Sequence, residues 1–467
     1  MSPTMPTNEK PNVLIVHTDQ QPWWMVSAYG RSPVPTPNID RLAAEGMRFE
    51  QFFTNSAVCT PSRGCFLTGR YPHCHGAYAN NLPLNPDEVT FAEVARRAGY
   101  RTSYVGKWHL DGTPRPGWVH PLRGMGFADN RYMFNRGHWT KMEDFAMADV
   151  QPAVHPYGVM GDEGTYTTDY LAGKTRAILA EAEQPWLHML SIPDPHDPAE
   201  IREPYASMFD PADMPLPATL GGETRHPLIG RAPFATRGWN GDPDALRSRM
   251  ALFCGEVACI DDHVGRLLEQ LEAAGQLDRT IVVFTTDHGD YMGEHGLTGK
   301  NGMYEGVYRL PLLIRWPLGG ELAVEPGGIE AGTVVRRVCS TVDFQPTLLS
   351  LMGVEPSGRE QGEDVLAARG PRGAADSAAG GASAGEGGVM FQHHSSQAAA
   401  GVITDRWHLV LFRDADGMLF DRREDPGEVR NLLADDACRD VVRELSAALV
   451  AHHRELDSPA AAWLAEE

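Results

Sequence analysis

Four short apolar segments of this chain each end at a group of polar, chemically reactive side chains. Residues 12–18 and 280–286 are nearly continuous apolar runs rich in β-branched residues, which is typical of strands buried in a parallel sheet. Residues 186–192 and 101–105 have the same character. The polar groups that follow these segments are, in chain order, Asp19-Gln20, Gly106-Lys107-Trp108-His109, Pro193-Asp194-Pro195-His196 and Asp287-His288.

Helical segments separate these strands. Residues 36–46 begin with Thr36-Pro37, where proline suits the first helical position, and residues 90–99 begin with a capping pair. A longer amphipathic segment covers residues 243–275. The alternation predicts an α/β fold with a large, mostly parallel, doubly wound sheet sandwiched by helices. Because ligands bind beyond the carboxyl ends of parallel strands, we expect the four polar groups to face one crevice.

The last quarter of the chain has a different pattern. Residues 367–388 are almost entirely Ala, Gly and Ser, which is typical of a flexible linker or insert. Short alternating segments separated by turn signals follow, and a helix is expected over residues 438–454. The sequence therefore predicts a large domain over residues 1–366, a linker, and a subdomain over residues 389–467 made of a small antiparallel sheet and a helix.

Composition restricts the classes of partner. The formal net charge of −21 disfavours nucleic acid and anionic membranes. The sequence contains no run of 18 apolar residues, so no transmembrane helix is predicted. Residues 1–11 lack the apolar stretch of a secretory signal. Seven cysteines without regular spacing favour a reducing compartment. We therefore expect a cytoplasmic protein.

Two of the strand ends have the composition of a metal site. Asp19, Gln20, Asp287 and His288 offer two carboxylates, an amide oxygen and an imidazole. Hard oxygen ligands suit Ca²⁺, Mg²⁺ or Mn²⁺, and the imidazole shifts the preference toward Mn²⁺ or Zn²⁺. A single Asp after a strand is more often a helix cap. Two of them, each with a coordinating neighbour, favour the metal.

The remaining reactive residues are a thiol and several cations. Cys59 and Arg63 belong to the segment Cys59-Thr60-Pro61-Ser62-Arg63. Each of the others, taken alone, is more often a surface lysine or a structural histidine; these are Lys107, His109, His196 and Lys300. Gathered in one crevice, they would line a local anion pocket that overcomes the acidic charge of the whole chain.

The motifs, taken together, resemble those of the type I sulfatases of the alkaline phosphatase superfamily. The resemblance rests on residues 11–20 (PNVLIVHTDQ), 36–46 (TPNIDRLAAEG), 59–72 (CTPSRGCFLTGRYP), 99–110 (GYRTSYVGKWHL), 195–198 (PHDP) and 285–297 (TTDHGDYMGEHGL). It implies a catalytic domain built on a large mixed sheet, a small C-terminal antiparallel sheet, and hydrolysis of a small anionic sulfate ester. It also implies a partner, the formylglycine-generating enzyme, which oxidises the motif cysteine.

By that resemblance, Cys59 is the formylglycine precursor and completes the shell of a divalent metal, with Ca²⁺ as the first choice. Asp19, Gln20, Asp287 and His288 occupy the metal-ligand positions. Arg63, Lys107 and Lys300 would bind the hydrated aldehyde and the sulfate. His109 would take the proton that restores the aldehyde, and His196, with Lys300, would serve the departing alcohol.

Two positions depart from the commonest sulfatase pattern, since Gln20 replaces a second Asp and His288 replaces an Asn. Neutral ligands leave more positive charge at the site, as in phosphonate monoester hydrolases and choline-sulfatase-like relatives. A phosphonate monoester or phosphodiester hydrolase is therefore an alternative function. A catalytically silent anion-binding protein with an unmodified Cys59 is another. The leaving group and the oligomeric state are not indicated by the sequence.

Overall fold

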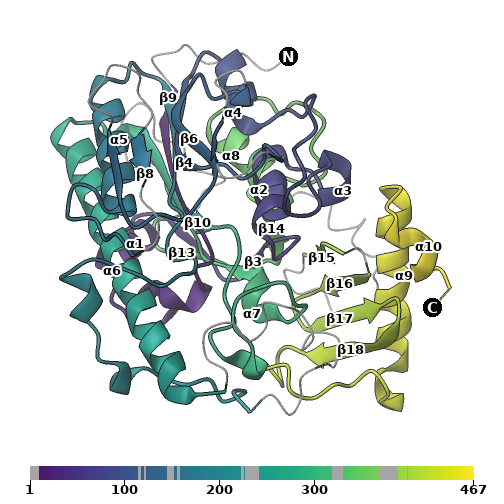
Figure 1. Cartoon of the computed structure of the whole chain (residues 1–467). Coiled ribbons are helices and arrows are strands. Elements are labelled where there is room, and N and C mark those ends of the chain that lie inside the picture. The colour runs from purple at the N-terminus through teal and green to yellow at the C-terminus, as the bar shows by residue number, and fades with distance from the viewer. Residues whose placement is uncertain are drawn as a thin grey trace.

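The computed structural model describes residues 10–113, 117–119, 123–144, 152–154, 158–221, 226, 241–317, 330–367, 388–396 and 398–466. Figure 1 shows a large α/β part and a smaller antiparallel sheet packed at one side of it. Among the helices of the described residues, none combines the length and the apolar character that a bilayer crossing requires.

The large sheet is mixed and mostly parallel, as predicted. Nine strands of the described residues form it, in the order β13-β2-β12-β10-β1-β9-β4-β6-β5. All pairs are parallel except β2 with β12, β12 with β10, and β5 with β6. The strands are β1 (Asn12–Thr18), β2 (Met47–Phe49), β4 (Arg101–Lys107), β5 (Gly117–Trp118), β6 (Asp129–Arg136), β9 (Trp186–Ser191), β10 (Thr280–Thr286), β12 (Leu312–Arg315) and β13 (Thr333–Val335).

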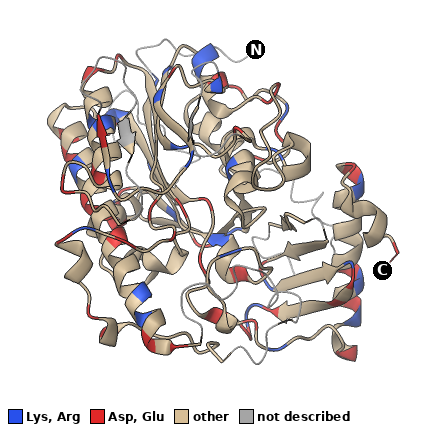
Figure 2. Ribbon diagram, in the orientation of Figure 1, with Lys and Arg blue, Asp and Glu red and all other residues tan. Residues whose placement is uncertain are grey.

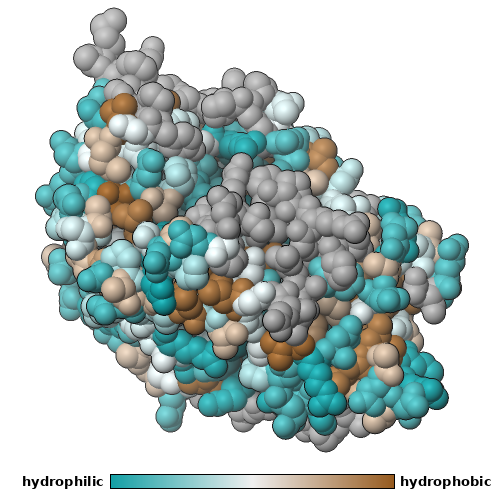
Figure 3. Space-filling view, turned by 60° about the horizontal axis from the view of Figure 1, so that its bottom comes forward, coloured by the Kyte–Doolittle hydropathy of each residue, from teal (hydrophilic) through white to brown (hydrophobic). Residues whose placement is uncertain are grey.

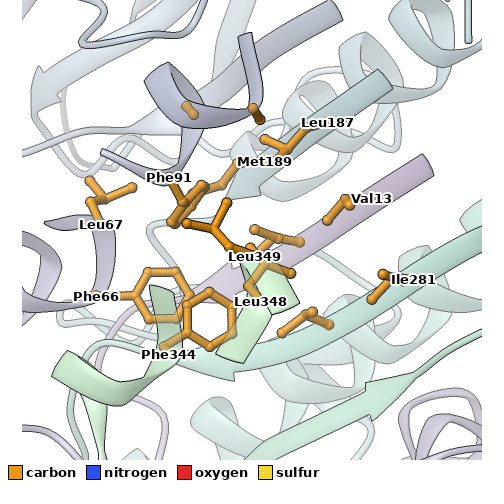
Figure 4. Packing of buried hydrophobic residues seen from close by; sticks show 14 of the residues in the cluster. Val13, Phe66, Leu67, Phe91, Leu187, Met189, Ile281, Phe344, Leu348 and Leu349 are labelled. Atoms are coloured by element: carbon orange, nitrogen blue, oxygen red, sulfur yellow. The ribbon is translucent and has the colours of Figure 1, made fainter. Parts of the chain in front are cut away.

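Helices cover both faces of this sheet, because successive strand residues point to opposite sides. Val13 and Ile15 of β1 face one core, whereas Leu14 and Val16 face the other. On one face lie α2 (Cys59–Thr68), α4 (Phe91–Arg97) and α8 (Thr341–Leu351), and Figure 4 shows their apolar side chains against the strands. On the other lie α1 (Pro37–Ala44), α5 (Thr167–Glu181) and α6 (Pro243–Ala273).

The predicted helix starts are mostly confirmed. Pro37 is the first residue of α1, and Asp242 caps α6 through the backbone N–H of Asp244. Thr90 caps α4 by accepting from the Glu93 backbone N–H at 3.2 Å. The Glu93 side chain instead binds Arg96 and Arg97 of its own helix, so the expected capping box is formed by its Thr90 half.

The small sheet is antiparallel, with the order β15-β16-β17-β18 among the described residues. Its strands are β15 (Met390–His393), β16 (Ala399–Ile403), β17 (Trp407–Phe412) and β18 (Ala415–Asp421), and α9 (Arg439–Glu455) and α10 (Ala460–Leu464) pack on its outer face. This confirms the expected sheet and helix, although β15 was not predicted. Residues 368–387 of the expected linker lie outside the described residues, and the boundaries 1–366 and 389–467 stay a prediction.

Short elements complete the chain between these layers. They are β3 (Phe52–Phe53), β11 (Arg309–Leu310) and β14 (Cys339–Ser340) in one small sheet, β7 (Met142–Asp144) and β8 (Pro152–Val154) in another, and the helices α3 (Pro72–His75) and α7 (Glu305–Tyr308). Charged residues gather on the outer helices, whereas the central strands carry few (Figure 2). On the face shown in Figure 3 the hydrophobic patches are small and separated by hydrophilic surface.

Candidate active site

Four predicted site residues meet beyond the carboxyl ends of the central strands. One ligand atom from each of Asp19, Cys59, Asp287 and His288 lies within 4.8 Å of the others, and all four side chains are buried. Asp19 and Asp287 come side by side because β1 and β10 are parallel neighbours that end in register, Thr18 opposite Thr286. The sequence expectation that these distant segments form one cluster is therefore confirmed.

The thiol reaches the cluster from a different direction. Cys59 is the first residue of α2, so it lies at the positive end of the helix dipole. Ser62 donates a hydrogen bond to the backbone carbonyl of Asp287, and Thr60 donates to that of His109 at 2.9 Å. These two bonds tie the first turn of α2 to the strand ends, which places the Cys59 Sγ 3.3 Å from the His288 Nε2.

Arg63 organises the two carboxylates from one turn further along α2. Its Nη2 binds the Asp19 Oδ2 at 2.8 Å and its Nε binds the Asp287 Oδ2 at 3.0 Å. Its Nη1 donates to the Lys107 carbonyl and to the Ser191 hydroxyl. The guanidinium thus holds the outer oxygen of each carboxylate and leaves the Oδ1 atoms facing Cys59 and His288.

Two lysines and two histidines line the other side of the cluster. The Lys300 Nζ lies 2.8 Å from the Cys59 Sγ and 2.8 Å from the His196 Nε2. The Lys107 Nζ binds the Asp19 Oδ2 at 2.6 Å and lies 3.2 Å from the His138 Nε2. The His138 and His196 rings stack 4.1 Å apart, so the two lysine–histidine pairs form one continuous wall.

The hydrogen bonds of the histidines define which ring nitrogen carries the proton. The Nδ1 of His288 faces the Gly289 carbonyl at 2.9 Å, and the Nδ1 of His196 faces the Asp197 carbonyl at 2.9 Å. A carbonyl only accepts, so both Nδ1 atoms donate and both Nε2 lone pairs point into the site. His196 Nε2 therefore accepts from the Lys300 ammonium, and His288 Nε2 is oriented as a metal ligand.

Charge within the buried site favours anions. Burial and the Asp19 carboxylate oppose ionisation of Cys59, but Lys300 and Lys107 outweigh them and lower the pKa of this thiol below its usual value. Burial, together with the Lys300 ammonium, holds the pKa of His196 well below its usual value. Three cationic side chains thus face two carboxylates, leaving an excess of positive charge for a bound anion.

Gln20 lies beside the cluster in a separate hydrogen-bond network. Its backbone N–H donates to the Asp287 Oδ1 at 3.0 Å, and its side-chain Nε2 donates to the Asp290 Oδ2 at 2.6 Å. Arg249 of α6 binds Asp290 at 2.7 Å and Asp197 at 3.0 Å. Because the amide nitrogen is used by carboxylates, Oε1 is the atom of Gln20 left to act as a ligand. An Asp at this position would face Asp290 with a like charge.

His109 is joined to the site through its backbone, whose carbonyl accepts from the Thr60 hydroxyl of α2 at 2.9 Å. It is buried, and its φ of 59° lies in the left-handed region, as does the φ of 65° at Gln20. Such backbone conformations cost free energy in non-glycine residues and gather at functional sites. Both residues lie just beyond a strand end, where the chain leaves the sheet sharply.

Sequence reasoning missed three contributors. His138 and Ser191 contact the lysine and arginine of the site, and Arg249 holds the carboxylates that orient Gln20. His138 follows β6 by two residues, so the strand-end rule applies to it as well. The β6 segment DNRYMFNR has no apolar run, however, so it was not recognised as a strand and the residues after it were not considered.

The donor set suits a divalent cation. Two buried carboxylates present their Oδ1 atoms, and His288 presents a lone pair, to one small region beside Cys59. Gln20 can add a neutral oxygen. Carboxylate and amide oxygens with one imidazole fit Ca²⁺, Mg²⁺ and Mn²⁺, and Zn²⁺ remains chemically compatible.

Comparisons with known proteins agree with this geometry. The family profile Sulfatase matches residues 11–354, and a profile described as N-sulphoglucosamine sulphohydrolase, C-terminal, matches residues 293–455. The uncharacterized sulfatase YidJ of Escherichia coli (strain K12) is 30% identical over 476 residues, which cover 97% of this chain and 88% of that protein.

Two solved structures extend the comparison to the fold. One, in complex with its substrate D-glucosamine-2-N,6-O-disulfate, has a TM-score of 0.74 and 25% identity, covering 96% of this chain and 98% of that one. The phosphonate monoester hydrolase of Agrobacterium radiobacter has a TM-score of 0.76 and 26% identity, covering 96% of each chain.

Proposed function

Because this chain belongs to the sulfatase family of the alkaline phosphatase superfamily and is a sulfuric ester hydrolase, we propose that the cluster around Cys59 is where the sulfate ester is hydrolysed. The observation that carries the proposal is the position of the Cys59 Sγ. It lies 2.8 Å from the Lys300 Nζ and 3.3 Å from the His288 Nε2, inside the carboxylate cluster. A nucleophile at this position contacts the metal ligands and the cations together.

Oxidation of Cys59 would give formylglycine, and a hydroxyl of its hydrated aldehyde would be the nucleophile that attacks sulfur. A divalent cation would lower the pKa of that hydroxyl. Asp19, Gln20, Asp287 and His288 would hold that cation. We propose Ca²⁺ because most of these donors are hard oxygens. A formylglycine-generating enzyme is then a required partner, and we propose the cytoplasm as the compartment because none of the seven cysteines, all described, forms a disulfide.

Other side chains of the site would bind the substrate, position the carboxylates and transfer protons. Lys107 and Lys300 bind the equatorial oxygens of the tetrahedral anion, and Arg63 keeps Asp19 and Asp287 in position. The Lys300 ammonium donates to the His196 Nε2, so this pair can deliver a proton to the departing alcohol oxygen. His109, held beside α2, is proposed as the base that takes the proton when the aldehyde is restored.

A phosphonate monoester or phosphodiester substrate is the second candidate. Gln20 is a neutral donor where a second Asp is common, which leaves more positive charge for a phosphoryl group. The Agrobacterium radiobacter hydrolase also shares the fold over nearly the whole chain. The sulfate ester is preferred because the family profile and the YidJ relative are sulfatases.

Two measurements test the proposal. Mass spectrometry of the peptide that contains Cys59, from protein made in its native host, should show the change from thiol to aldehyde. An unmodified thiol there would support the silent anion-binding alternative. The kcat/KM values for an aryl sulfate and an aryl phosphonate monoester should favour the sulfate, and a large preference for the phosphonate would replace the first candidate by the second. The Cys59→Ala variant is the inactive control.

A further inference from the structure

A second group of histidines lies away from the site just described, in the C-terminal part of the chain. One ring nitrogen from each of His393, His452 and His453 lies within 4.8 Å of the others. His393 is the last residue of β15, and the other two are in the last turn of α9. His393 and His453 are buried, and His452 is half-buried. The proposed catalytic steps use none of the three.

The spacing of these nitrogens approaches that of a metal site. The Nε2 atoms of His393 and His452 are 3.0 Å apart. Two imidazole ligands of a tetrahedral zinc ion, each with a Zn–N bond of about 2.0–2.1 Å, have nitrogens about 3.4 Å apart. Small ring rotations would therefore admit an ion. A single N–H···N hydrogen bond also explains the 3.0 Å contact, but it leaves the third histidine unexplained.

His453 supplies the second observation. Its Nδ1 lies 2.8 Å from the Ser458 hydroxyl, which fixes the ring. Its Nε2 is buried and has no hydrogen-bond partner among the described residues. A buried polar atom without a partner is energetically unfavourable, and a metal ion would remove that cost by using the lone pair. The Ser458 contact is also the kind of bond that orients a ligating histidine.

The surroundings hold the rings in place. The His452 ring stacks on Phe391 at 3.8 Å and meets the edge of Tyr71 at 4.6 Å. His452 and His453 also lie at the carboxyl end of a 17-residue helix, where the dipole favours a cation. His73 of α3 stacks on His393 at 5.3 Å and brings a further imidazole to the edge of the group.

We propose that His393, His452 and His453 bind a divalent transition-metal ion of the zinc class, which joins β15 to the end of α9. Imidazole ligands select Zn²⁺, Cu²⁺ or Ni²⁺ over Ca²⁺ and Mg²⁺. The site is thus chemically distinct from the oxygen-rich cluster around Cys59. The backbone N–H of His393 donates to the carbonyl of Asn55, four residues before Cys59, at 2.7 Å. An ion at His393 would therefore also stabilise the contact between the small sheet and the segment that leads to Cys59.

Zn²⁺ binding to the full chain tests the proposal. Chelator-treated wild type and the variant His452→Phe are titrated with Zn²⁺ in excess Ca²⁺, with circular dichroism to check folding. Phenylalanine keeps the stacking on Phe391 but offers no nitrogen. We expect the variant to lose one equivalent of Zn²⁺, or to bind it more than about 100-fold more weakly, since even outer contacts of a metal site cost about 10–100-fold.

The matched control is His394→Phe, the same substitution next to His393, at a ring whose Nδ1 lies 2.7 Å from the Ser396 hydroxyl and which is not one of the three clustered histidines. It should leave the Zn²⁺ stoichiometry unchanged. Equal stoichiometry and affinity in wild type and His452→Phe would overturn the proposal. A crystal of the wild type soaked in Zn²⁺ needs no variant: an anomalous peak among the three rings supports the site, and its absence at saturating Zn²⁺ refutes it.

Discussion

Replacing Arg249 by Gln should destabilise the protein and loosen the candidate metal site together. The guanidinium lies between two carboxylates, 2.7 Å from the Asp290 Oδ2 and 3.0 Å from the Asp197 Oδ1. Asp290 is fully buried and accepts the amide N–H of Gln20 at 2.6 Å. Without the cation, two neighbouring carboxylates repel each other, and the one that orients Gln20 is left buried and uncompensated.

The size of the effect follows from the burial of the pair. Removing one partner of a buried ion pair costs about 3–5 kcal/mol. Unfolding entropy is about 2.1 cal/mol/K per residue, so a chain of 467 residues loses about 1 °C of melting temperature per kcal/mol. The Arg249→Gln variant should therefore melt about 3–5 °C below the wild type.

Differential scanning calorimetry at saturating metal measures this shift. Arg247→Gln is the matched control, because Arg247 lies on the same helix and pairs with the exposed Asp244 at 2.9 Å. Exposed pairs contribute about 0–1 kcal/mol, so the control should shift by less than about 1 °C. If Arg249→Gln melts as the control does, the buried clamp contributes nothing and the reasoning fails. A partial rescue by Asp290→Asn in the same chain would strengthen it.

Three further predictions concern the backbone, pH and the leaving group. Gly106→Ala should lower the soluble yield and melting temperature, because φ is +109° and the new Cβ would lie 1.9 Å from the Ser191 carbonyl oxygen. In contrast, Gly173→Ala in α5, where the new Cβ meets no heavy atom within 4 Å, should stabilise the folded protein by up to about 1 kcal/mol. Burial raises the pKa of Asp261 to about 6, so between pH 4 and 6 the folded state holds a proton that the unfolded chain loses. The free energy of unfolding of the wild type should therefore fall by about 3 kcal/mol as pH rises through that window. Melting curves of Asp261→Asn should lack this fall. Lys300→Ala should lower kcat for an alkyl sulfate by about 10²–10⁴-fold but less for 4-nitrophenyl sulfate, whose leaving group needs no proton, and equal losses for both would argue against Lys300 as a proton donor.

The parallel part of the sheet and the residues at its strand ends could be predicted, because both depend on local sequence. Apolar β-branched runs indicate buried strands, and parallel pairing brings their carboxyl ends to one edge. Asp19, Lys107 and Asp287 therefore met as expected. The antiparallel strands β2 and β12 at one side of the sheet could not be predicted, since Met47–Phe49 and Leu312–Arg315 are too short to be recognised by periodicity.

The function of a side chain within the cluster depends on contacts that the sequence does not contain. The motif indicated Arg63 as an anion-binding residue, but its N–H groups contact two carboxylates, a carbonyl and a hydroxyl of the protein itself. Arg249 lies in the second turn of a long amphipathic helix, where an arginine is usually solvated. Only the packing of α6 against the loop after β10 reveals that it neutralises Asp290.

The acidic charge of the chain and its preference for an anionic substrate are compatible because they act over different distances. The net charge of −21 is carried largely by exposed residues of the outer helices and the small sheet (Figure 2). At physiological ionic strength the field of such charges is screened over about 8 Å, whereas charges buried beside a ligand are screened much less. Lys107 is buried against Asp19 and Lys300 is half-buried against Cys59, so they dominate the free energy of the bound anion. The acidic surface then governs the approach of the substrate, and the local excess of buried cations governs its binding.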